Sequence, residues 1–151
     1  MVCIDGYVTQ VAMANDEFRA QLPDGYVVLH KTIRFWSKAC EVLDGLRVVP
    51  GGADEPMRDT GDLEIDGHRI VWKIHYYDRL GWFRCQPLDK DCVRVLTAMV
   101  GDGFSGSARE FWQQLEQQQK HKKESIWQQS SMSMRQRLQR VMTSSVEPAG
   151  E

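Results

Sequence analysis

A β-hairpin over residues 60–78 constrains the fold of this chain more than any other stretch of the sequence. Its turn is Asp66-Gly67, the pair that a two-residue type I′ turn prefers, because glycine takes a positive φ without steric cost. The turn also sets the register, so that Ile65 faces His68 and Glu64 faces Arg69. Side chains directly opposite each other lie on the same face of a sheet. The hairpin therefore predicts which of its side chains are buried.

The two faces of this hairpin differ in polarity. The apolar face carries Leu63, Ile65, Ile70, Trp72, Ile74 and Tyr76. The other face carries Asp62, Glu64, Arg69, Lys73 and His75, together with Val71 and Tyr77. We expect the first face to be a core with Trp72 at its centre. We expect the second to be mostly solvated, with a cross-strand ion pair between Glu64 and Arg69.

The chain of 151 residues suits one domain plus an appendage, and its content of 42% hydrophobic and 26% charged residues is ordinary for a soluble protein. No apolar run approaches the ~18–20 residues needed to span a bilayer. The N-terminus shows no basic region followed by an apolar stretch, so we expect no signal peptide and a cytoplasmic location. The four cysteines form no C-x-x-C pair, which favours reduced, packed thiols over a zinc site.

The rest of the first hundred residues predicts a small α+β domain, with an antiparallel sheet built around the central hairpin and packed by helices. Apolar spacing predicts helices over residues 8–22 and 33–46, and β-branched and aromatic residues predict a short strand over 25–29. Residues 49–61, rich in Gly and Pro, predict a loop. We expect a helix over 89–100, capped by Asp89 and ended by Gly101-Asp102-Gly103.

A helical extension follows this domain. Ser107-Ala-Arg-Glu110 is a capping box that starts a helix, and Phe111, Trp112 and Leu115 are placed to pack its first turns on the domain. Residues 116–125 contain no apolar side chain, so they form either a solvated helix or no stable structure. The predicted organisation is a domain over 1–104, an extension over 105–143 and a disordered tail over 144–151.

The extension carries a candidate protein-binding surface. Trp127, Met134, Leu138 and Val141 follow a 7-4-3 spacing, which is typical of a short heptad seam. Tryptophan and methionine are enriched in protein interfaces, whereas lysine and glutamate are depleted there. We therefore expect the extension to pair with another copy of the chain, giving a homodimer, or to dock on a host protein. The alternative is that this segment folds back onto the domain as a further core helix.

The same extension carries six basic residues between positions 116 and 140, against Glu116 and Glu124. They are Lys120, Lys122, Lys123, Arg135, Arg137 and Arg140. With Trp112 and Trp127 nearby, such residues can follow phosphates and stack on bases, so nucleic-acid binding is the alternative function. A solubilising helix face explains the same pattern.

The strand W-K-I-H-Y-Y-D, residues 72–78, resembles an uncharacterised domain-of-unknown-function family of small bacterial proteins found on plasmids, prophages and other mobile elements. The family strand reads W-K-I-D-Y-Y-D, so His75 departs from it. Asp66-Gly67 and the V-L-T-A-M-V segment over 95–100 correspond as well, and the resemblance covers roughly residues 10–104. It implies a fold and a mobile-element context, and no activity. By analogy of context, we expect such a protein to counter a host defence system of the CRISPR or restriction type.

The sequence lacks the signatures of common enzymes. A restriction-type nuclease needs an acid two residues before Lys73, where Val71 stands, so Asp62 and Glu64 are not expected to hold a metal. No G-x-S-x-G is present, and His75 and Cys85 have no motif that joins them. The glycines at 101–106 lack the Lys-Ser/Thr of a phosphate loop. We therefore expect a non-enzymatic protein without cofactor or metal.

Overall fold

The structure is a computed structural model and describes residues 4–48, 55–79 and 84–144. The chain falls into two compact units, Met1–Trp112 and Gln113–Glu151. The first unit contains helices α1 (Ile4–Gln21), α2 (Lys31–Arg34) and α3 (Ala39–Val48), and the start of α4 (Ala108–Ser144). It also contains strands β1 (Val27–Leu29), β2 (Thr60–Ile65), β3 (His68–Tyr77) and β4 (Val93–Val100), with a short 3-10 turn at Asp24–Tyr26.

The predicted hairpin is confirmed in position and register. Strands β2 and β3 pair antiparallel, with Ile65 opposite His68 and Glu64 opposite Arg69. Asp66 and Gly67 both take positive φ, 51° and 76°, as the type I′ turn requires. The turn chemistry therefore sets the register of this part of the sheet.

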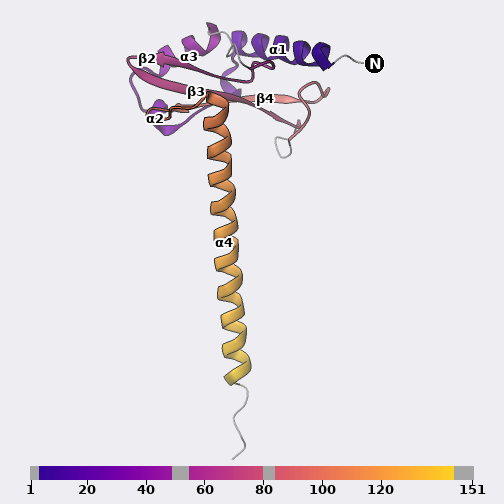
Figure 1. Cartoon of the computed structure of the whole chain (residues 1–151), viewed down its shortest axis with the longest axis vertical. Coiled ribbons are helices and arrows are strands. Elements are labelled where there is room, and N and C mark those ends of the chain that lie inside the picture. Colours follow the sequence, from indigo (N-terminus) through magenta and orange to yellow (C-terminus); the bar gives the residue numbers. More distant parts are fainter. Residues whose placement is uncertain (1–3, 49–54, 80–83, 145–151) are drawn as a thin grey trace, which may run out of the picture. The chain divides into compact units, whose positions relative to one another are not determined.

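The four strands form one mixed sheet in the order β1-β4-β3-β2. Strand β4 runs antiparallel to β3, whereas β1 pairs with β4 in parallel, with Val27 opposite Leu96. The α+β class is confirmed. The expected antiparallel sheet is mixed because β1 joins its far edge in parallel, and the hairpin forms the other edge with β2 outermost (Figure 1).

The helix expected over residues 89–100 is wrong, because Val93–Val100 is strand β4. The spacing of Cys92, Val95, Leu96 and Met99 fits a helix, but Val93, Val95 and Val100 are β-branched and favour a strand. Strand β4 lies between β1 and β3, and backbone pairing on both sides outweighs the local helical pattern. The Gly101–Gly103 segment consequently ends a strand, and Gly103 takes a φ of 80°.

The helix predicted over 8–22 is confirmed as α1, which lies beside α3 (Figure 1). The helix expected over 33–46 is interrupted and forms α2 and α3, separated by Phe35–Lys38. The break lets Ile33 and Val42 both reach the core, while Phe35 stays exposed. Residues 49–54 of the expected loop lie outside the described residues. Residues 55–59 form no helix or strand, as expected, whereas Thr60 and Gly61 belong to β2.

The core lies on the predicted apolar face of the hairpin, and Trp72 is fully buried at its centre. The cluster of buried residues joins β3 and β4 to the end of α1 and to α2 and α3; it comprises Leu22, Ile33, Val42, Leu46, Ile70, Trp72, Ile74, Leu96 and Ala98. This arrangement confirms the assignment of the apolar face, and three helical segments and the sheet share one core.

The opposite sheet face is more covered than predicted. Asp62 and Glu64 are exposed as expected, but Val71 is fully buried, and Ala108 and Trp112 at the start of α4 are buried as well. The rings of His75 and Trp112 meet edge to face with centroids 6.0 Å apart. The predicted Glu64–Arg69 pair is wrong, because Arg69 binds the diagonal Asp62, with its Nε 2.8 Å from Oδ2. The guanidinium also donates to the backbone carbonyl of Phe104.

Candidate interaction helix and polar sites of the domain

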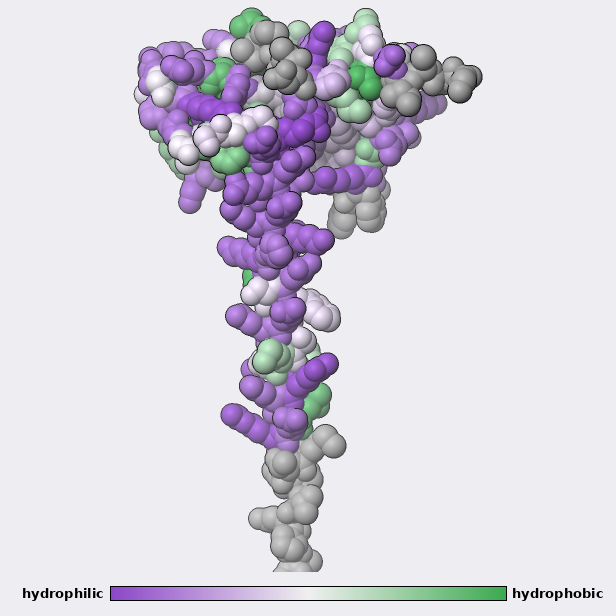
Figure 2. Space-filling model, viewed as in Figure 1, coloured by the Kyte–Doolittle hydropathy of each residue, from purple (hydrophilic) through white to green (hydrophobic). Residues whose placement is uncertain are grey.

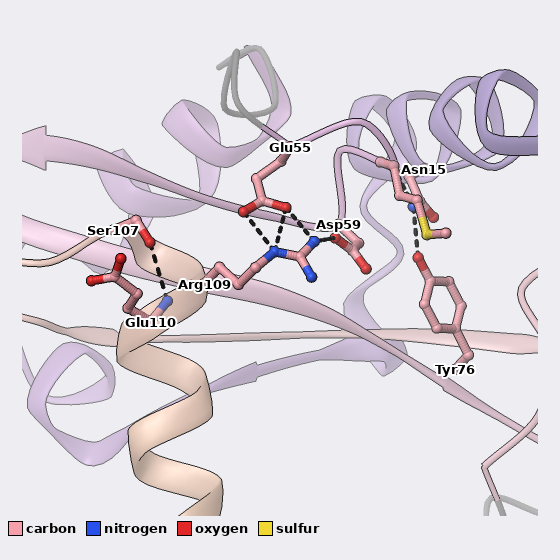
Figure 3. Close-up of polar contacts among 8 residues, drawn as sticks. Asn15, Glu55, Asp59, Tyr76, Ser107, Arg109 and Glu110 are labelled. Carbon is pink, nitrogen blue, oxygen red and sulfur yellow. Dashed lines mark hydrogen bonds and ion pairs between the residues drawn. The ribbon is translucent and has the colours of Figure 1, made fainter. Parts of the chain in front are cut away.

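Helix α4 begins where the capping box predicts. The backbone N–H of Glu110 donates to Ser107 Oγ at 3.2 Å, which satisfies one free donor at the helix start (Figure 3). The helix then continues through residues 116–125, the polar stretch whose structure the sequence left open. This stretch consists mainly of Gln, Lys and Glu, which have high helix propensity, and contains no Gly or Pro. Propensity therefore explains a helix here without apolar packing.

The four residues predicted to bind a partner lie along one side of α4, and we call them the apolar stripe. The exposed fractions are 74% for Trp127, 65% for Met134, 60% for Leu138 and 63% for Val141. Figure 2 shows a hydrophilic surface over the first part of the helix and hydrophobic patches farther toward its C-terminus. Large apolar side chains that are exposed together are typical of an interaction surface.

The six basic residues predicted as the nucleic-acid alternative are all exposed. Helical periodicity places Arg135 and Arg137 on opposite flanks of the apolar stripe, whereas Lys122 and Arg140 lie on the far side of the helix. The basic side chains are thus distributed around the helix rather than gathered on one face. A helix that binds in one groove of a duplex needs its basic side chains on one side, so this distribution does not favour that mode of binding.

A polar clamp joins the start of α4 to the segment that leads into β2. The guanidinium of Arg109 lies between the carboxylates of Glu55 and Asp59 (Figure 3). Its Nε donates to Glu55 at 2.7 Å and 2.8 Å, and Asp59 Oδ1 lies 3.6 Å from a terminal nitrogen. Burial raises the pKa of the Asp59 carboxyl, although the charge of Arg109 opposes this. The clamp places one arginine against two largely buried acids.

A second polar group lies between α1, β3 and β4. The amide nitrogen of Asn15 donates to Tyr76 Oη at 2.7 Å and to the carbonyl of Met57 at 2.9 Å. Its amide oxygen accepts from Arg94 Nε at 2.8 Å. Burial raises the pKa of Tyr76 well above its ordinary value. Asn15 is itself fully buried, and these bonds satisfy its amide.

The structure brings His75 and Cys85 to one cavity of about 240 Å³ toward the C-terminal end of β3. The other lining residues are Asp59, Lys73, Ile74, Tyr76 and Arg84. The thiol of Cys85 donates to the carbonyl of Tyr77 at 3.1 Å. Within residues 4–48, 55–79 and 84–144, no three His, Cys, Asp or Glu side chains are placed to hold a metal ion. The cavity thus places basic side chains of Lys73 and Arg84 in the same lining as the desolvated carboxyl of Asp59.

Sequence reasoning found the apolar stripe but missed the clamp and the Asn15 group. Arg109 stands inside the capping box and carries no signal of a long-range partner, and Glu55 belongs to a segment predicted only as a loop. Asn15 lies on the helix predicted over residues 8–22, and nothing near it in the sequence indicates a polar partner. None of these contacts has a local signature, because each joins segments far apart in the chain.

No protein-family model matches this chain, no curated protein is similar to it, and no solved structure matches it. The resemblance to mobile-element proteins, based on residues 72–78, therefore stays a prediction. Among the helices that the structure describes, none has both the length and the apolar character needed to cross a membrane.

Proposed function

We propose that this protein is a non-enzymatic binding factor whose helix α4 docks a helical segment of a protein chain along the apolar stripe. The observation that carries the proposal is the exposure of Trp127, Met134, Leu138 and Val141 on one side of a continuous helix. An amphipathic helix recognises a helical partner through apolar residues spaced by three, four and seven. The spacing of the stripe matches that mode.

Energetics support the same function. Each large apolar side chain that leaves water on binding contributes about 1.5–3 kcal/mol when fully buried. A tryptophan at the centre of an interface is a frequent hot spot. Trp127 is the largest member of the stripe and the most exposed of its four residues. Burying the four side chains of the apolar stripe against a partner would therefore make a favourable contribution to the free energy of binding.

The resemblance of residues 72–78 to proteins of plasmids and prophages suggests the setting for this binding. In that setting, the protein is an accessory factor of a mobile element that acts by occupying a surface on a protein, including a component of a host defence system. This part of the proposal rests on analogy of context.

Affinity capture from a bacterial lysate tests the proposal. The bait is the full chain, compared with the double variant Met134→Asp/Leu138→Asp, which places two charges in the stripe. The matched control, Gln129→Asp/Gln136→Asp, places the same charges on the opposite side of α4, at positions that are also exposed. We expect the full chain to capture a protein partner even after nuclease treatment. The Gln129→Asp/Gln136→Asp control should still capture this partner, whereas Met134→Asp/Leu138→Asp should not. Equal capture by both variants contradicts it.

The second candidate function is nucleic-acid binding through the six basic residues, which are all exposed on one helix. Binding to phosphates releases the counterions condensed on the nucleic acid. Because this release is less favourable at high salt, such binding weakens steeply as the salt concentration rises. A gel-shift titration against salt with Arg135→Gln/Arg137→Gln distinguishes this function from the first. Binding that is lost in this variant and falls with salt favours nucleic acid, whereas salt-insensitive capture of a protein favours the apolar stripe.

A further inference from the structure

We infer that the partner of the apolar stripe is a second copy of this chain, paired antiparallel along α4 between residues 124 and 141. This inference rests on the proposed function and names its partner. It follows from the residues that share the stripe and from those that flank it, since both must suit the facing helix.

The heptad pattern assigns each residue of the stripe a position. Trp127, Met134 and Val141 recur every seven residues and occupy position d, and Leu138 occupies position a. The remaining a positions are Ser131, which is half-buried, and Glu124, which is exposed. The seam therefore contains three large apolar residues at d, and at a it contains one large residue, one small residue and one charge.

A parallel dimer fits this seam poorly. In parallel pairs every residue faces its own copy, so Glu124 meets the partner's Glu124, and Trp127 meets the partner's Trp127. The first layer juxtaposes like charges, which is unfavourable. The second layer stacks the two largest side chains, while the Ser131 layer holds only two small ones. Cores pack best when large residues face small ones.

The antiparallel arrangement corrects each of these layers. Position a of one helix then faces position d of the other, so Trp127 meets the partner's Leu138, and Ser131 meets the partner's Met134. Glu124 meets the partner's Val141, at the end of the seam, where its carboxylate reaches water. Large and small residues alternate across the seam, and no like charges face each other within it.

The flanking positions agree. Arg135 occupies position e and Arg137 position g. In an antiparallel pair, e faces e and g faces g, which brings Arg135 beside the partner's Gln128 and Arg137 beside the partner's Ser130. Each arginine thus meets an uncharged residue that accepts hydrogen bonds. In an antiparallel pair of two copies of this chain, Arg135 and Arg137 therefore do not face like charges.

The mass of the full-length protein in solution tests the identity of the partner. We expect light scattering across a concentration series to show a monomer–dimer equilibrium. Met134→Asp/Leu138→Asp should weaken dimerisation roughly tenfold or more, since 1.4 kcal/mol corresponds to a factor of ten. Gln129→Asp/Gln136→Asp should leave the equilibrium unchanged. A monomer at every concentration, or a dimer equally stable in both variants, overturns the inference.

Disulfide cross-linking tests the orientation without altering the stripe. A mixture of Gln128→Cys and Arg135→Cys chains should cross-link if the helices are antiparallel, because these e positions face each other. A mixture of Lys123→Cys and Gln128→Cys chains should cross-link only if they are parallel, since g then faces e of the partner. The unchanged chain measures the background from native thiols such as the exposed Cys40. Cross-linking in the second mixture alone overturns the antiparallel pairing.

The failure of this inference can be separated from failure of the proposed function. If the protein is monomeric but the stripe variant alone loses a captured protein, the inference fails and the proposed function stands. If the protein is monomeric and the stripe variant captures the same proteins as the control, both fail. Circular dichroism of each variant establishes that α4 remains helical in these comparisons.

Discussion

Arg109 in the first turn of α4 donates from Nε to the carboxylate of Glu55, at 2.7 Å from Oε2, across more than fifty residues of sequence. The same guanidinium lies 3.6 Å from Asp59 Oδ1. One arginine therefore compensates the charge of two acids that the fold has largely removed from water. Removing it should lower the free energy of unfolding by more than the loss of a surface ion pair does.

Arg109→Ala should lower the free energy of unfolding by about 1–3 kcal/mol, because it leaves two desolvated carboxylates without their cation. Urea denaturation measures the change. The matched control is Arg47→Ala, which breaks an exposed pair with Asp44 one turn away on α3 and should cost less than about 0.5 kcal/mol. Equal losses in the two variants would show that the clamp contributes no more than a surface ion pair.

Asp59→Asn should change how stability depends on pH. Burial raises the pKa of Asp59 in the folded protein, so the folded state holds this proton more tightly than the unfolded chain. The contribution of Asp59 to the free energy of unfolding therefore falls as pH rises from the ordinary aspartate pKa, ~3.9, toward the raised value. Above the raised value this contribution no longer changes with pH. The variant lacks this fall, so its stability relative to the parent should increase through that window. Urea midpoints across the window measure it, with Asp44→Asn as the exposed control, and a difference that does not vary with pH would contradict the expectation.

Gly61→Ala should destabilise the domain by about 1–3 kcal/mol, because the added Cβ would lie 2.6 Å from the buried ring of Trp72. Gly6 in α1 has no atom within 4 Å of such a Cβ, so Gly6→Ala should be neutral or stabilise by roughly 0.5–1 kcal/mol. Thermal melts followed by tryptophan fluorescence compare the two. A Gly61→Ala protein with the same melting temperature as the parent would show that the Trp72 ring can shift to accommodate the added methyl group.

Cys92 should resist alkylation. Burial and its hydrogen bond with Cys85 raise the pKa of the Cys92 thiol to about 12, and only the thiolate reacts quickly. Cys40 is exposed. Iodoacetamide at pH 8, followed by peptide mass spectrometry, should therefore modify Cys40 well before Cys92. Urea should abolish this order, and labelling of Cys92 first in the folded protein would refute the assigned environment.

A chain that stops after Glu124 should keep the melting temperature of the domain and lose partner binding. Among the described residues, every buried one lies at or before Trp112, and the apolar stripe is exposed. Calorimetry and light scattering on the shortened and full chains measure both properties. A shortened chain that melts much earlier, while both chains are monomeric, would indicate that residues 125–151 are a core element of the domain.

The hairpin and the apolar stripe could be predicted because their information is local. Asp66-Gly67 specifies its own turn, and alternation in the flanking residues specifies the buried face. The stripe likewise depends only on the spacing of Trp127, Met134, Leu138 and Val141 along one helix. These features need no knowledge of distant segments.

Strand β4 and the polar groups could not be predicted in this way. Residues 93–100 satisfy helix and strand patterns alike, and pairing with Val27–Leu29 on one side and β3 on the other decides between them. Asn15, Tyr76 and Arg94 come from three elements, and nothing near any of them in sequence identifies the other two. Such contacts depend on the assembled sheet.

The parallel pairing of β1 with β4 has a consequence for synthesis of the chain. Val27 cannot meet Leu96 until strand β4 has left the ribosome, whereas the hairpin can close as soon as Tyr77 emerges. At translation rates of about 5–20 residues per second, β1 waits several seconds for its only strand neighbour among the described residues. The nascent protein therefore passes through a stage in which Val27–Leu29 is fully made but unpaired, and in that interval the segment is available to a chaperone.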